Sequence, residues 1–234
     1  MASFYDSIKG LFNQEMTKKI ADVLAEKDAN VSKANSQIIA GLLGVLAKNG
    51  HTPHIRNIFD ESGNINLISD IGMFDEHLTH PEQEMGDDFL QELLGDKAEA
   101  FTLPISKDTG VPAVGVNRLI SVIAPSFPAF FGQKMVKDGM KFDTIINEVR
   151  EQEKTYASKI PADLIKALGL GTVLGASRTT TAAGTATTQQ RVVSPTPTPE
   201  PKKKKNSWIT WLFVILALLL LFFWWRSCNS PKDD

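Results

Sequence analysis

The four histidines of this sequence are the side chains best suited to metal chemistry, and they form two His-x-x-His pairs. They are His51 and His54, followed by His77 and His80. Four imidazoles could hold a divalent metal ion if the two loops met, and such a site could support a metal-dependent hydrolase. A proline interrupts the first pair and another follows the second, and residues 72–85 are predicted to be an irregular surface connection. We therefore expect solvated loop histidines, with no metal and no cofactor.

Other patterns with chemical potential are weaker. Residues 19–38 have the outline of a helix-turn-helix, but the next helix offers Ile, Leu, Gly and Val where side chains that read bases are needed. Gly169, Gly171 and Gly175 imitate a dinucleotide loop without the preceding strand. Residues 1–200 carry 19 Lys and Arg against 25 Asp and Glu, which suits a nucleic-acid backbone poorly. We expect neither an enzyme nor a nucleic-acid partner.

Residues 208–225 read WITWLFVILALLLLFFWW and contain no charged side chain. As a helix they would be about 27 Å long, close to the thickness of a bilayer's hydrocarbon core. Tryptophans mark both ends, as is typical of membrane interfaces. These anchor residues are Trp208, Trp211, Trp224 and Trp225. The sequence therefore predicts a transmembrane helix over residues 207–226.

Basic residues flank this segment and predict its orientation. Lys202, Lys203, Lys204 and Lys205 precede it, and Arg226 follows it, where all five could meet lipid headgroups. The excess of charge on the N-terminal side predicts a cytoplasmic body and a tail, residues 227–234, on the far side of the membrane. Cys228 in that tail could pair with a second copy or be incidental.

A linker separates the anchor from the rest of the chain. Residues 177–206 lack apolar periodicity, are rich in Thr and Ala at first, and end in a Pro-x-Pro run and four lysines. Such a spacer spans on the order of 30 Å. The body, residues 1–176, is thus predicted to be tethered to the membrane and not embedded in it.

The body is predicted to be a helical bundle, because apolar residues recur at helical spacing and no run alternates as a strand would. Residues 38–47 and 119–132 are apolar on nearly every face and should be the central helices. The segment 113–137 should bend at Pro125 and Pro128. Gly41 and Gly44 should let a neighbouring helix approach closely.

An internal repeat is also predicted, with copies over about residues 14–60 and 94–152. Residues 27–31, KDANV, parallel residues 107–111, KDTGV, and each stretch precedes a strongly apolar segment that ends in Lys-Asn-Gly or Lys-Asp-Gly. Two copies of one helical unit packed together would bury both apolar segments.

The stretches IADVLAEKDANVSKANSQIIAGLLGVLAKNG, residues 20–50, and GVPAVGVNRLISVIAPSFPAFFGQKMVKDG, residues 110–139, resemble the bacterial family called domain of unknown function 937. Members of that family in Bacteroidetes-type bacteria carry a Thr/Pro linker and a transmembrane helix, often followed by an OmpA-like domain. Since no such domain follows residue 226 here, peptidoglycan binding is not carried over. The resemblance implies a helical fold and a location in a bacterial inner membrane, with the body in the cytoplasm and the tail in the periplasm, and it implies no activity.

These patterns together predict a membrane-tethered, non-enzymatic interaction or scaffold protein. Its expected partners are the lipid bilayer and another protein, and a second copy of the chain is an open option. The alternative is a membrane-active or pore-forming effector, in which residues 38–47 and 119–132 leave the bundle and enter the bilayer. The metal-dependent hydrolase is the lesser alternative.

Overall fold

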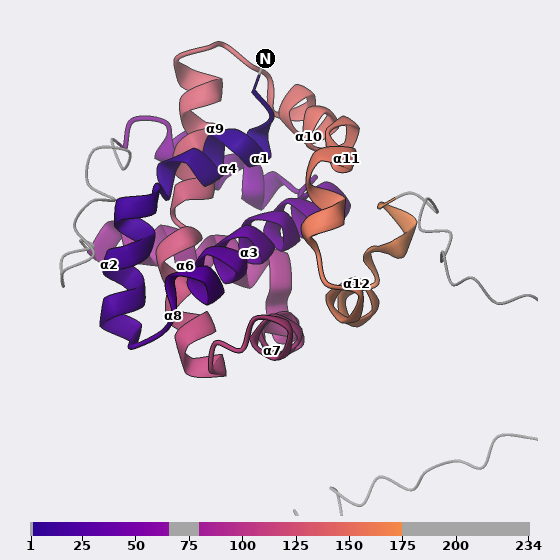
Figure 1. The fold of residues 1–234 in the computed structure, drawn as a ribbon. Coiled ribbons are helices and arrows are strands. Elements are labelled where there is room, and N and C mark those ends of the chain that lie inside the picture. Colours follow the sequence, from indigo (N-terminus) through magenta and orange to yellow (C-terminus); the bar gives the residue numbers. More distant parts are fainter. Residues whose placement is uncertain (1, 66–79, 175–234) are drawn as a thin grey trace, which may run out of the picture. The chain divides into compact units, whose positions relative to one another are not determined.

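The computed structural model describes residues 2–65 and 80–174, and every regular element in these two ranges is a helix (Figure 1). The expected all-α fold is confirmed for this part of the chain. The linker 177–206, the predicted transmembrane helix 207–226 and the tail 227–234 lie outside the described residues.

The first helices begin where the sequence supplies a capping side chain. Ser3, Asn13 and Thr52 each accept a hydrogen bond from a backbone N–H in the first turn that follows, at 3.0, 2.9 and 3.1 Å. Only the longest of these helices starts without a side-chain cap. The four helices are α1 (Phe4–Leu11), α2 (Gln14–Leu24), α3 (Asp28–Asn49) and α4 (Pro53–Ser62).

The second described range begins inside a helix and continues through short ones. The helix α6 (His80–Leu94) includes residues 80–85, which the sequence predicts to be irregular, so that prediction is wrong there. A proline and a glutamate at positions 81 and 82 suit a first helical turn, which explains the early start. The other elements are η1 (Gly95–Lys97), α7 (Ala98–Thr109), α8 (Ala113–Ile123), α9 (Ser126–Val136), α10 (Phe142–Glu151), α11 (Glu153–Tyr156), η2 (Ala157–Lys159), α12 (Ala162–Leu168) and η3 (Leu170–Thr172).

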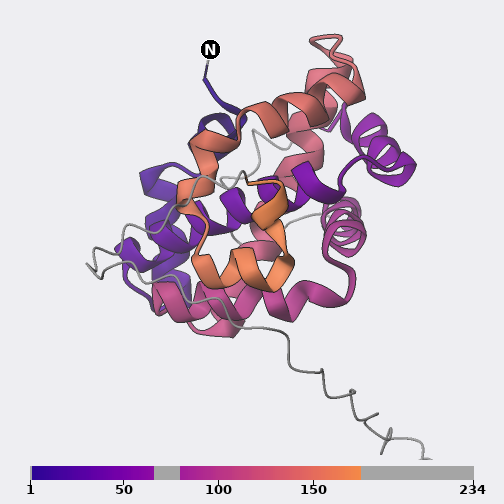
Figure 2. The same cartoon turned by 90° about the vertical axis from the view of Figure 1, so that its right-hand side faces the viewer.

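Helix α3 is the centre of the bundle. It packs against α1, α2, α7, α8 and α10, and every residue from Gln37 to Ala47 is buried. Figure 2 shows the elements from α10 to η3 lying across it. Two basic side chains join these elements to α3: Arg150 donates to the Ala47 carbonyl at 2.8 Å, and Lys48 donates to the Leu168 carbonyl at 2.9 Å. Both carbonyls lie near helix ends, where backbone acceptors lack partners within the helix. The prediction that residues 38–47 form a central helix is confirmed.

The glycines of α3 admit its neighbours, as the sequence predicts. A Cβ atom on Gly41 would lie 2.9 Å from the ring of Phe101 and 3.1 Å from Leu164. A Cβ atom on Gly44 would lie 3.2 Å from both Ile160 and Leu170. These distances are shorter than ordinary carbon–carbon contacts of about 3.5–4.0 Å, so an alanine at either position would have to displace side chains of α7 or of the elements after α11.

The second apolar segment divides into α8 and α9, separated at residues 124 and 125. Pro125 lies at this break, as predicted, whereas Pro128 lies inside α9 without ending it. Ala113–Val136 is the one helical stretch among the described residues that is long and apolar enough to cross a membrane, and 67% of its most apolar window is buried in the bundle. Buried core helices commonly meet the same criterion, so its length and composition are weak evidence of a membrane span.

Helices α4 and α9 approach each other closely at two glycines, Gly63 and Gly132. A Cβ atom on Gly132 would lie 2.6 Å from the backbone nitrogen of Gly63. Beside this contact, the Ser62 hydroxyl lies 2.7 Å from the Pro128 carbonyl oxygen. The rings of Phe59 and Phe131 stack at 5.3 Å between centroids. Backbone contact, a buried hydrogen bond and ring stacking therefore join α4 to α9 within the hydrophobic core.

Candidate functional site

The structure places the first histidine pair on the surface. The Nε2 atom of His51 lies 2.9 Å from the Oδ1 atom of Asp143 at the start of α10, and both side chains are more than half exposed. His54 is exposed on α4. The backbone of His80 begins α6, while its side chain and all of His77 lie outside the part of the chain that is described.

A metal site would need several such ligands in one place. Within residues 2–65 and 80–174, no three side chains of His, Cys, Asp or Glu gather in an arrangement that could hold a metal ion. What the described residues bring together is one imidazole and one carboxylate, linking the end of α3 to α10. That pair is suited to an ion pair when the imidazole is protonated.

The predicted anchor and headgroup residues fall outside the described chain. They are Trp208, Trp211, Trp224, Trp225, Lys202, Lys203, Lys204, Lys205 and Arg226. Their assignment to a membrane therefore stays a prediction.

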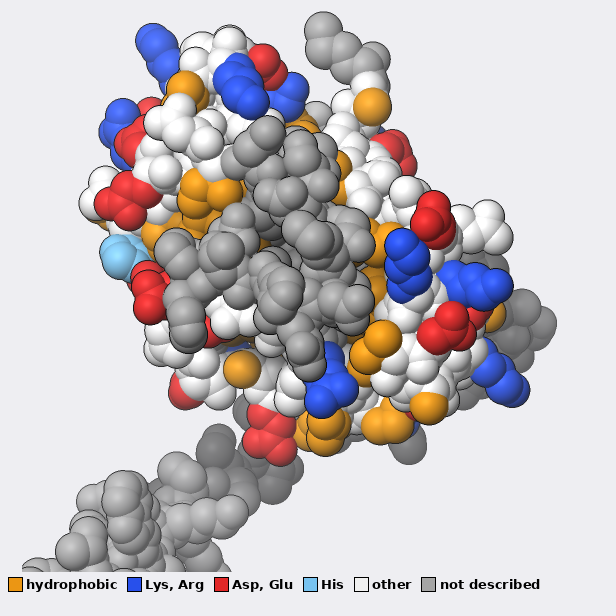
Figure 3. All heavy atoms as spheres, turned by 90° about the vertical axis from the view of Figure 1, so that its left-hand side faces the viewer, with side chains coloured by type: hydrophobic (Ala, Val, Ile, Leu, Met, Phe, Trp, Pro, Cys, Tyr) orange, Lys and Arg blue, Asp and Glu red, His pale blue; other side chains and the backbone are white. Residues whose placement is uncertain are grey.

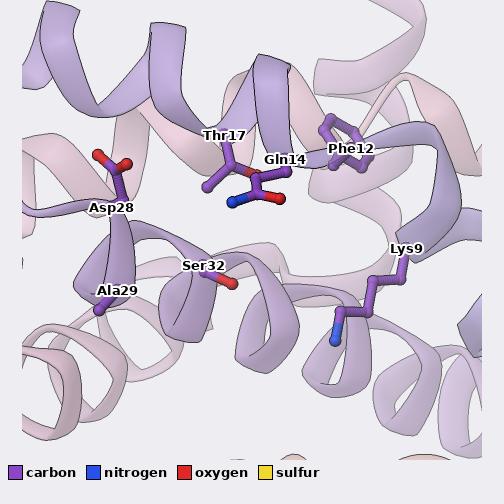
Figure 4. Close-up of a pocket in the computed structure, with 7 residues that line it drawn as sticks. All are labelled: Lys9, Phe12, Gln14, Thr17, Asp28, Ala29 and Ser32. Carbon is purple, nitrogen blue, oxygen red and sulfur yellow. The ribbon is translucent and has the colours of Figure 1, made fainter.

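A surface cleft of about 420 Å³ lies between α1, α2 and the first turns of α3 (Figure 4). Phe12 contributes apolar surface, and Thr17 is held in place because its hydroxyl donates to the Asn13 carbonyl at 2.9 Å. Four further polar side chains line it: Lys9, Gln14, Asp28 and Ser32. We call this feature the α2–α3 cleft.

The polar groups of the α2–α3 cleft are free to meet a partner. The side chains of Gln14, Asp28 and Ser32 make no hydrogen bond or ion pair with any described residue, and Lys9 contacts only the ring of Tyr5, at 5.8 Å. Figure 4 shows Lys9 and Asp28 at opposite ends of the cleft, with the other polar side chains between them. The cleft therefore presents a cation, a neutral hydrogen-bonding centre and an anion in order.

A second polar feature lies between α3 and α7. The Nζ atom of Lys33 donates to the backbone carbonyl of Asp108 at 2.7 Å and lies 3.1 Å from its carboxylate, to which the Gln37 amide also donates. Nearby, Lys107 and Asp163 pair at 3.3 Å between α7 and α12. We call Lys33, Gln37, Lys107, Asp108 and Asp163 the α3–α7 seam. Hollows of about 330 and 250 Å³ flank Asp108.

The charged groups of the α3–α7 seam are paired with one another, and one buried oxygen of Gln37 is not. The hydrogen bonds from Gln37 and Lys33 lower the pKa of Asp108, because they stabilise its charged form. A carboxylate accepts only, so the Gln37 amide must turn its nitrogen toward Asp108, and within the described structure its buried Oε1 atom has no partner. This geometry fits a clamp between helices better than an open site.

The sequence alone singles out none of these residues as a site. Lys107 and Asp108 form one copy of the repeated Lys-Asp motif, and this repeat is what in the sequence could have drawn attention to them. Lys9, Gln14 and Ser32 lie on helices with ordinary amphipathic patterns. Only the packing of α2 beside α3 turns them into the lining of one cleft.

On the face in Figure 3, the acidic and basic side chains of the described residues are interspersed. Hydrophobic side chains are exposed there among acidic and basic ones. Four large apolar side chains in the described ranges are at least half exposed, and the most exposed is Val114 at 72%. Scattered exposure of this kind is normal for a protein surface and marks no site alone.

Comparison with known proteins agrees with this helical body. A family model described as a bacterial protein of unknown function, DUF937, matches residues 6–134, which span α1 to α9 and include the whole α2–α3 cleft. No curated protein and no solved structure matches the chain. The matched segment covers more than half of the 234 residues. The chain belongs to the DUF937 family of bacterial proteins.

Proposed function

We propose that this chain is a membrane-tethered helical interaction or scaffold protein that acts without catalysis. The observation that carries the proposal is the charge-free segment 208–225, which follows four consecutive lysines. The helical body supports it: the α2–α3 cleft offers unpartnered polar groups for binding. The anchor would hold the body near the cytoplasmic face of an inner membrane.

Such a protein acts by raising the local concentration of its helical body next to the membrane. A body held by a spacer of about 30 Å samples a thin layer next to the bilayer, so a weak contact with another membrane-held protein becomes effectively intramolecular. Affinity that would be too low in free solution then suffices. The linker 177–206 sets how far from the membrane that contact can form.

The single cysteine makes the proposed topology directly testable. Cys228 would lie on the periplasmic side, so a membrane-impermeant maleimide should label it in intact cells after the outer membrane is made permeable. A Ser3→Cys, Cys228→Ser variant should be labelled only after the inner membrane is lysed. Labelling of position 3 in intact cells, or protection of Cys228, would contradict the orientation.

The anchor itself is tested by fractionation. Full-length protein should remain in the membrane pellet after carbonate extraction, and a variant lacking residues 207–226 should move to the soluble fraction. Replacing Lys202–Lys205 with glutamine keeps the apolar segment and serves as the matched control. A truncated chain that stays in the extracted pellet would rule out residues 207–226 as the sole anchor.

We also infer that the body contains a duplicated helical unit. Helices α2 and α7 both end at a residue with positive φ, Ala25 at 54° and Gly110 at 79°, and the long apolar segment starts three residues later in each case. A ten-residue helix, α4 or α10, follows each segment. The Lys-Asp motifs do not correspond in position, since Asp28 begins α3 whereas Asp108 lies in the last turn of α7.

A membrane-active effector is the alternative that one observation favours. Ala113–Val136 has the length and apolar composition of a membrane span. Its burial in the bundle means that insertion would first have to open the core. Full-length protein added to dye-filled liposomes of anionic lipid should cause no leakage if the tethered role is correct. Leakage that depends on residues 119–132 would support the effector instead.

A further inference from the structure

The α2–α3 cleft carries charges of opposite sign at its two ends, Lys9 and Asp28 (Figure 4). Its centre is neutral and can both donate and accept hydrogen bonds through Gln14 and Ser32. Among the described residues, none of these four side chains has a hydrogen-bonding or ion-pair partner, and Lys9 lies over the Tyr5 ring. Read from either end, the cleft shows a charge, a neutral centre and the opposite charge.

Such a surface is complementary to itself under a twofold axis. When two copies meet with the axis through the middle of the cleft, Lys9 of one copy faces Asp28 of the other, and the reverse pair forms at the opposite end. Gln14 and Ser32 then face their equivalents, where an amide and a hydroxyl can bond in either direction. We propose that the α2–α3 cleft is a contact surface for a second copy of this chain.

The two ion pairs of this contact lie at the ends of the cleft and not in its centre. Two concave surfaces placed face to face enclose a space, and the polar lining of the cleft suits bridging water, which interfaces commonly retain. A small, wet contact with two exposed ion pairs is weak in free solution. The inference therefore rests on the proposed membrane tether, which holds copies in one plane and orientation and raises their effective concentration.

Energy transfer between copies in one membrane tests the contact. Full-length chains carrying Cys228→Ser and Glu99→Cys, an exposed position on α7, are labelled with donor or acceptor and reconstituted together at a fixed protein-to-lipid ratio. Transfer should exceed the value expected for random encounters. Lys9→Glu alone and Asp28→Lys alone should each weaken association roughly tenfold, because each places two like-charged pairs at the contact.

The decisive sample mixes the two variants. A Lys9→Glu donor chain with an Asp28→Lys acceptor chain places opposite charges at both ends of the contact: the original Lys9–Asp28 pair at one end and the charge-exchanged pair at the other. Transfer should therefore return. Lys166→Glu and Asp60→Lys, which change exposed residues outside the cleft by the same charge, should leave transfer unaltered. Circular dichroism of each variant should match that of the parent chain.

Two results would overturn the contact: transfer that survives both single reversals, or transfer that the mixture fails to restore. The recovery of each variant in the membrane pellet is measured on the same samples. A chain missing from the pellet refutes the tether, whereas a chain that is in the pellet without transfer refutes the cleft contact. The two failures are thus distinguishable.

Discussion

Replacing Gly132 with alanine should destabilise the body more than any other single methyl group added on α9. The new Cβ atom would clash with the carbonyl oxygen of Phe59 and lie 2.6 and 2.9 Å from the nitrogen and Cα atoms of Gly63. All three are backbone atoms and cannot rotate away, so α4 and α9 must separate. That separation also strains the hydrogen bond between Ser62 and the Pro128 carbonyl.

The size of the effect follows from two opposing terms. Forcing one extra carbon into a packed core costs about 1–3 kcal/mol, and the backbone position of this contact favours the upper end. Alanine in a helix interior recovers about 1 kcal/mol relative to glycine. The expected loss is about 2 kcal/mol, which lowers Tm by on the order of 4–8 °C for a domain of this size.

The assay is thermal unfolding of the full-length chain in detergent micelles, followed by circular dichroism at the helix band. Gly10→Ala is the matched control, because Gly10 is exposed on α1 and nothing lies within 4 Å of the place its new methyl group would take. It should raise stability by about 0.5–1 kcal/mol through helix propensity alone. If Gly132→Ala is as stable as Gly10→Ala, the close approach of α4 and α9 is wrong.

Three further predictions concern single polar groups. The pKa of Asp108 is lowered in the folded chain, so its contribution to the free energy of unfolding is present above its unfolded pKa of about 3.9 and is lost as pH falls through the folded value. When unfolding in urea is measured between pH 6 and 3, Asp108→Asn should therefore lose less stability on acidification than the parent chain. Tyr156 is buried and donates a hydrogen bond to the Val149 carbonyl at 3.0 Å, and burial raises the pKa of its hydroxyl. The stability of the folded chain should therefore fall as pH rises above about 10, and it should fall less steeply in Tyr156→Phe. Ser62→Ala should cost about 1 kcal/mol in the same urea assay, since it removes a buried hydrogen-bonding hydroxyl between α4 and α9; an unchanged midpoint would contradict the role of that hydroxyl.

Much of the helical pattern was predictable because its causes are local. The residues Ser3, Asn13 and Thr52 cap helices that start directly after them, and Pro125 lies at the break between α8 and α9. The start of α6 was not predicted, because a Pro-Glu step is compatible with a loop and also suits a first helical turn. Local signals of this kind leave helix boundaries uncertain by a few residues.

The candidate sites were much harder to predict. Lys33 and Asp108 are 75 residues apart and meet only because α7 packs beside α3. Lys9 and Asp28 face one cleft for the same reason, since α1 and α2 fold back along α3. The histidine spacing, by contrast, suggested chemistry that the described residues do not assemble.

The sequence by itself determined the class of this protein: a helical body with a buried Ala/Gly/Leu-rich segment and membership of the DUF937 family. The membrane tether after that body stays a prediction. These properties depend on composition and on spacing of a few residues, which the chain carries without folding. Only the tertiary structure decided which elements approach Gly41 and Gly44, that Gly132 is a further point of close approach, that Asp108 is clamped, and that four polar side chains share a cleft. Each of these depends on distances between helices far apart in the chain, which periodicity along one helix cannot specify.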